Sequence, residues 1–137
     1  MTKKITDFID DSALRGLKEQ NKDGSMSGGH NGPYLDQDTP VRNTAHWILI
    51  WSSQKNKTNY SDFKCAINNA LDYLIGLYHD RKKGCYICRT NLNKDSSNGL
   101  IGQAWLFEGL IAGSAETKRL EARELALNIF NQHRFDC

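Results

Sequence analysis

Residues 100–111, LIGQAWLFEGLI, are apolar on nearly every side of a helix. A second stretch of the same kind, AHWILIW, covers residues 45–51. A helix that is apolar all round must be buried all round, so both stretches predict inner helices, over about 40–54 and 98–114. Thr39 and Pro40 suit the N-cap and first position of the earlier one.

Three segments around these stretches are apolar on one side only, which predicts outer helices over about 4–20, 59–79 and 116–132. The middle one has the cleanest stripe, which runs over five turns. The residues expected to face the core are Ile5, Phe8, Ile9, Ala13 and Leu17 in the first; Phe63, Ile67, Ala70, Leu71, Leu74, Leu77 and Tyr78 in the second; and Leu120, Leu125, Ala126, Ile129 and Phe130 in the third.

The predicted fold is therefore all-α, with about five helices in a two-layer array of α/α-hairpins that forms one domain over residues 1–137. The helices alternate outer, inner, outer, inner, outer. The two long connections, about 21–39 and 80–97, each precede an inner helix. We therefore expect both loops at the same end of the array, next to the beginnings of the inner helices.

Charge and hydropathy argue against two classes of partner, nucleic acids and membranes. Eighteen basic and sixteen acidic residues give a net charge of +2, and the densest basic run, Arg81 to Lys83, is three residues long. This balance argues against a nucleic-acid partner. The N-terminal residues do not resemble a secretory signal, and the run at 45–51 is too short to span a bilayer. A cytoplasmic protein without a membrane partner is expected.

Cys85 and Cys88 have the C-x-x-C spacing, and Cys65 and Cys137 complete the four cysteines. No βαβ pattern surrounds the pair, as a thioredoxin-like motif would require. Only His79 lies near enough in sequence to suggest a third zinc ligand, and a structural zinc site needs four. A structural role is favoured, while a metal or redox role stays open. The glycine-rich segment 24–32 lacks the strand context of a dinucleotide site, so no cofactor and no metal are predicted.

Four segments carry a family resemblance: DGSM at 23–26, GHNGPY at 29–34, DTPVRNTAHW at 38–47 and NGLIGQAW at 98–105, the last followed by EGL at 108–110. Together they resemble hairpins of the six-hairpin (α/α)6 toroid proteins of the glycosidase-like superfamily. The chain holds only about two hairpins of such a toroid. The resemblance implies the fold and a saccharide-binding rim. It does not carry catalysis over, because these proteins assemble their catalytic machinery around the whole bore.

The end of the array that holds both loops is the candidate site. Carbohydrate recognition needs aromatic platforms and planar polar groups, and glycoside hydrolysis needs paired carboxylates. The tryptophans Trp47 and Trp105 are the candidate platforms. The expected ligand-binding residues are His30, Asn31, Tyr34, Arg42, Asn43, Trp47 and Gln103, and the weaker catalytic candidates are Asp36, Asp38, His46 and Glu108.

Structural roles compete with each of these assignments. Asp38 suits an ion pair with Arg42, or a position that helps to cap the helix over about 40–54. Asp36 suits a turn, and His46 suits a hydrogen-bonded position in the core. Glu108 is either a functional acid or a partner of the first long loop, and the tryptophans are favoured as core or interface residues. An ion pair between Asp38 and Arg42 would favour structure, whereas two carboxylates facing one cleft would favour an enzyme.

Three functions follow from these alternatives. The first is a non-catalytic, self-associating domain that binds a carbohydrate or a small polar ligand. The second is a glycosidase- or lyase-like enzyme fragment that is active only when assembled. The third is a protein-interaction module. The all-round apolar stretch at 100–111 also predicts that one side of its helix lacks a neighbour, which suggests a homo-oligomer, most simply a two-fold dimer.

Overall fold

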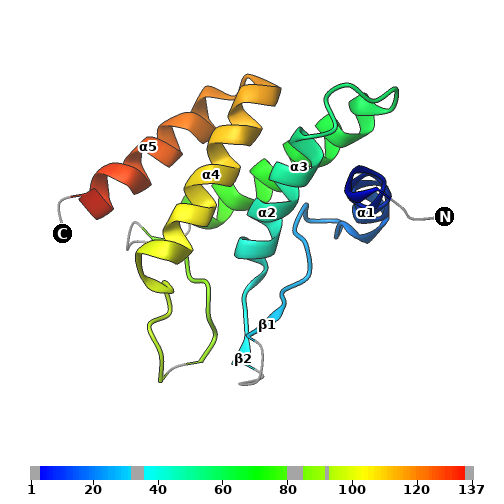
Figure 1. The fold of residues 1–137 in the computed structure, drawn as a ribbon. Coiled ribbons are helices and arrows are strands. Elements are labelled where there is room, and N and C mark those ends of the chain that lie inside the picture. The colour runs from blue at the N-terminus through cyan, green and yellow to red at the C-terminus, as the bar shows by residue number, and fades with distance from the viewer. Residues whose placement is uncertain (1–3, 32–35, 80–84, 92, 135–137) are drawn as a thin grey trace.

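The computed structural model describes residues 4–31, 36–79, 85–91 and 93–134 (Figure 1). This part of the chain contains five helices and one pair of two-residue strands, so the all-α prediction is confirmed. The elements are α1 (Ile5–Glu19), β1 (His30–Asn31), β2 (Asp36–Gln37), α2 (Pro40–Ser52), α3 (Tyr60–His79), α4 (Gly99–Thr117) and α5 (Leu120–Arg134).

The two inner helices lie side by side, with α3 behind them and with α1 and α5 at opposite ends of the array (Figure 1). Glycines on α4 allow the close approach. A Cβ atom built on Gly109 would lie 2.8 Å from the Cβ of Ala45, and one on Gly113 would lie 2.9 Å from a methyl carbon of Leu71. Interiors packed at this density have no room for one more methyl group.

The same substitution should therefore have opposite effects at two helical glycines. Gly76 on α3 is exposed, and a Cβ atom there meets nothing within 4 Å. We expect Gly76→Ala to raise the free energy of unfolding by about 0.5–1 kcal/mol, since alanine favours helix. Gly109→Ala should lower it, because overpacking costs about 1–3 kcal/mol and its new methyl would meet the Ala45 backbone. Urea denaturation of both variants tests this, and shifts of the same sign would contradict it.

The prediction that both inner helices are buried all round is confirmed for α2 and is wrong in part for α4. Every residue of α2 is buried or half-buried, and Trp51 is completely enclosed. On α4, by contrast, Leu100 and Ile101 are 59% and 58% exposed. Both residues are in the first turn of α4, at the loop end, whereas further along, the helix packs against α2, α3 and α5.

Both terminal helices depart from the predicted core. On α1, Ile5 and Phe8 are 80% and 69% exposed, and burial is confined to Ala13 and Gly16. Only the second half of α1 packs against α2, so its first half has an apolar stripe without cover. On α5, Ala122 is buried in place of Leu120, which is 67% exposed.

The stripe predicted for α3 is largely confirmed, with its members buried from Phe63 to Leu74 and Leu77 half-buried. The helix ends differ modestly from prediction. The α4 helix continues to Thr117 and ends on Lys118, whose φ of 64° is left-handed, and α5 therefore begins at Leu120.

The predicted common end of the two long loops is confirmed, because backbone hydrogen bonds join them. The Thr39 amide donates to the Cys88 carbonyl at 3.0 Å, and Asp38 forms an isolated antiparallel bridge with Arg89. Figure 1 shows both loops below α2 and α4. The strand pair in the first loop, with His30 opposite Gln37, was not predicted, since two residues per strand are too few to create an alternating pattern.

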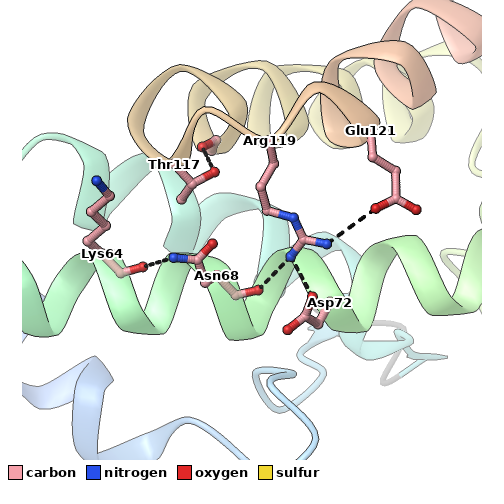
Figure 2. Close-up of polar contacts among 7 residues, drawn as sticks. Lys64, Asn68, Asp72, Thr117, Arg119 and Glu121 are labelled. Carbon is pink, nitrogen blue, oxygen red and sulfur yellow. Dashed lines mark hydrogen bonds and ion pairs between the residues drawn. The ribbon is translucent and has the colours of Figure 1, made fainter.

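At the other end of the array, Arg119 fixes the α4–α5 turn onto α3 (Figure 2). Its guanidinium donates to the Asn68 carbonyl and to a carboxylate oxygen of Asp72, and it lies 3.4 Å from Glu121. The Ser114 hydroxyl also donates to the Arg119 carbonyl at 2.8 Å. These contacts hold α5 against α3 and α4.

Candidate functional site

Arg42 is at the centre of the cluster that the structure assembles at the loop end of α2 and α4. It forms an ion pair with Asp38, whose side chain is only 3% exposed. The Arg42 guanidinium carbon also lies 5.3 Å from the centre of a Trp105 ring, within cation–π range. The sequence alternative in which Asp38 pairs with Arg42 is therefore the one observed, and this carboxylate is not open to a cleft.

His46 contacts the same tryptophan one turn further along α2. Its ring is edge-on to Trp105, with the ring centres 5.4 Å apart. Partial burial and the nearby Arg42 charge lower the pKa of His46, and the Glu108 carboxylate partly opposes that shift. The imidazole is therefore neutral at pH 7, with one nitrogen available as a donor and the other as an acceptor. Glu108 itself is exposed on α4.

The sequence offered Trp105 as a candidate platform but favoured a core or interface role for the tryptophans. Trp105 is half-buried, and it lies between Arg42 and His46. A usable signal was Glu108, three residues later: a charge on the same helical face indicates that this face reaches water. Figure 1 shows that α2 and α4, which carry these side chains, lie next to each other above the loops.

Trp47 is on the flank of α2 that packs against α1, whereas Asn43 lies next to Arg42, since a Cβ atom built on Gly29 would lie 3.5 Å from the Asn43 amide and 3.8 Å from the Arg42 guanidinium. The Asn43 amide donates to the Ser27 carbonyl at 2.7 Å. Trp47 packs against α1 so closely that a Cβ atom on Gly16 would lie 2.2 Å from its ring. The structure therefore separates Trp47 from Trp105, and it gives Trp47 a packing contact between α1 and α2.

Gln103 is completely buried and bonds to the second loop. Its side chain accepts from the Tyr86 amide at 2.9 Å and donates to the carbonyls of Tyr86 and Ser97 at 3.0 and 2.9 Å. These bonds use both amide hydrogens and one lone pair of the oxygen. Because Gln103 is also completely enclosed, the structure gives it a role in holding the second loop, and its assignment as a ligand-binding residue stays a prediction.

Four of the predicted residues are placed only in part. Tyr34 lies outside the described residues. For His30, Asn31 and Asp36 the backbone alone is described: Asn31 pairs with Asp36 in the β1–β2 ladder at the loop end. Their assignments as ligand-binding or catalytic residues stay predictions.

The C-x-x-C pair contains one buried and one half-buried thiol. Cys88 is 1% exposed, and a Cβ atom on Gly102 would lie 3.2 Å from its sulfur. Burial raises the pKa of Cys88 to about 11, so its thiol is neutral below that pH and weakly nucleophilic. Among the described residues no three or more His, Cys, Asp or Glu side chains are grouped to hold a metal ion.

The cluster combines a flat aromatic ring, a cation held by a carboxylate, and a neutral imidazole. Guanidinium and imidazole groups donate to hydroxyl and carboxylate oxygens, and an indole supplies an apolar surface with a polar edge. No helix in the described ranges is both long and apolar enough to cross a membrane.

Comparison with known proteins gives one relative. The chain is 37% identical over 131 residues to archaeal glycosylation protein Q of Haloferax volcanii, a match that covers 96% of this chain. The chain spans only 35% of the length of that relative. No protein-family model matches the chain, and no solved structure matches it with significance.

Proposed function

We propose that this chain is a saccharide-binding helical domain with a role in glycosylation, and that it does not itself catalyse a reaction. The ligand lies against the α2–α4 face, which consists of Arg42, His46 and Trp105. We further propose that the five helices are an arc of an (α/α) toroid. The observation that carries the proposal is the grouping of the Arg42 guanidinium and the His46 imidazole around the half-buried Trp105.

The similarity to archaeal glycosylation protein Q supports the proposed role in glycosylation. A protein with 37% identity over nearly the whole of this chain is named for glycosylation, and proteins of that process handle saccharides. Because the matched part is about a third of the relative, a binding role suits this chain better than the relative's entire activity.

The geometry supports binding over catalysis. Asp38 is buried and neutralised by Arg42, so it is poorly placed as an acid or a nucleophile. One observation favours the enzyme alternative: His46 has a lowered pKa next to Glu108, and a neutral imidazole at pH 7 is suited to a general base. Release of nitrophenol from p-nitrophenyl glycosides, abolished by His46→Ala, would establish that alternative in place of ours.

The direct test is to titrate the protein with glucose, N-acetylglucosamine and glucuronate while recording the indole NMR signals of the three tryptophans. We expect a saccharide at millimolar concentration to shift the Trp105 signal and to leave Trp51 unchanged, because Trp51 is fully enclosed. Trp105→Ala should abolish the binding, since it removes the flat apolar surface of the indole on which the sugar ring would lie.

Trp47→Phe is the matched control. It alters a tryptophan of α2 that packs against α1, and we expect it to bind as the unaltered protein does. If none of the three sugars perturbs Trp105, or if Trp47→Phe and Trp105→Ala weaken binding equally while both remain folded, the α2–α4 face is not the site.

A further inference from the structure

We propose that two copies of this chain associate through one exposed apolar stripe of α4, with the two α4 helices antiparallel about a two-fold axis. The edge stripe consists of Leu100, Ala104, Phe107, Ile111 and Ala115. These positions are four, three, four and four residues apart, so they share one side of the helix. This inference is independent of the saccharide proposal.

The edge stripe is apolar and accessible along its whole length. Leu100, Ala104 and Ala115 are exposed, and Phe107 and Ile111 are half-buried. None of the five carries a charge or a polar side chain. Water in contact with such a surface is unfavourable, and soluble monomers rarely keep a contiguous apolar patch of this kind uncovered.

The α5 helix widens this surface. Its Phe130 is 48% exposed, with its ring centre 5.7 Å from that of Phe107. Leu120 and Leu127 on the same helix are 67% and 43% exposed, with the exposed Glu124 between them on the same helical side. The contacts of Arg119 hold α5 in place (Figure 2), so the two-helix surface is formed before any partner arrives.

The area is sufficient for a stable pair. The 19 residues of α4 form a helix about 28 Å long, and two neighbouring helices are about 20 Å across. Each copy would thus contribute a footprint of roughly 550 Å². Together the two footprints exceed the total of about 1,000 Å² that separates specific interfaces from casual contacts.

The order of large and small side chains along the edge stripe suits packing against the same stripe of a second copy. In the antiparallel arrangement Leu100 faces the second copy's Ala115, and Ala104 faces the second copy's Ile111. Leu100 and Ile111 then each meet an alanine, and the two Phe107 rings meet each other beside the axis. A parallel pairing would place alanine against alanine and leave gaps, which close packing disfavours.

The two-fold arrangement also explains why association stops at two. An interface that pairs with itself uses the same surface on both copies and leaves none for a third. At the opposite flank of the array the second half of α1 packs on α2, with the Trp51 indole donating to the Ala13 carbonyl at 3.2 Å. The axis is perpendicular to the two α4 helices, so the α2–α4 faces of both copies lie on the same side of the dimer.

The test begins with light scattering of the full chain at tens of micromolar. We expect a mass of twice 15.5 kDa. Ala104→Glu places a charge in the interface at an exposed position, and it should weaken association by at least about a hundredfold, because an unpaired buried charge is strongly unfavourable. Phe8→Glu, at an equally exposed apolar site on α1, is the control and should remain dimeric.

Mixing two variants tests the register. Ile111→Lys should also be monomeric and folded by circular dichroism, since the lysine stem reaches water from a half-buried position. Mixed with Ala104→Glu, it should form a heterodimer in which the new glutamate faces the new lysine. A monomeric unaltered chain, a dimer insensitive to Ala104→Glu, or variants that fail to pair when mixed would each overturn the proposal.

Discussion

Trp51→Ala is expected to lower the free energy of unfolding by about 3–5 kcal/mol, the usual cost of removing a large aromatic side chain from a core. Trp51 is completely enclosed and lies beside Trp47, with the ring centres 5.6 Å apart. Its indole nitrogen also donates to the Ala13 carbonyl of α1. The substitution therefore leaves a cavity and removes a link between α1 and α2.

Thermal denaturation followed by circular dichroism measures this effect. For a chain of this length the expected loss corresponds to a fall of roughly 10–20 °C in Tm. Trp105→Ala is the matched control, because Trp105 is half-buried and its loss should cost clearly less. Equal falls in Tm for the two variants would show that Trp105 belongs to the core and would remove it from the proposed site.

Gln103→Met is the second substitution with a large expected effect. Methionine has a similar volume, so the packing of α4 is kept while three hydrogen bonds to the loop at 85–98 are lost. Each buried polar group left without a partner costs about 1–3 kcal/mol. We expect the free energy of unfolding to fall by at least about 3 kcal/mol in urea denaturation.

Gln54→Met is the control for Gln103→Met. Gln54 is also buried, at 3% exposure, but its side-chain amide donates only to the neighbouring Ser53 hydroxyl, at 3.0 Å. Its replacement should cost about 1 kcal/mol or less. Faster hydrogen exchange at the Tyr86 amide in Gln103→Met, and not in Gln54→Met, would locate the effect in the loop. An unchanged Tyr86 exchange rate would contradict this account of Gln103.

Loss of the Gln103 hydrogen bonds should also affect the position of Arg42 in the candidate site. The loop that Gln103 holds also supplies the Cys88 carbonyl that accepts from the Thr39 amide. Thr39 follows Asp38, which pairs with Arg42. The side-chain amide of Gln103 on α4 therefore helps to orient the first turn of α2. The sequence contains no indication of this link, because Gln103 and Thr39 are far apart in the chain.

The site was predictable only where both partners are close in the sequence. The pairing of Asp38 with Arg42 follows from a spacing of four residues, and it was among the alternatives recognised. The contact of Arg42 with Trp105 joins α2 to α4. No periodicity within a helix reports which residue of another helix will lie opposite, so this contact needed the tertiary structure.

The sequence by itself determined the number, order and approximate limits of the helices, and it placed both long loops at one end. This was possible because the spacing of apolar residues, read at 3.6 residues per turn, indicates which sides of a helix are buried. Only the tertiary structure decided which neighbour covers each side. An apolar helix face indicates that the face is buried, but it does not indicate which element buries it. The exposed edge of α4, the exposed first half of α1 and the burial of Gln103 therefore became clear only from the packing of the helices.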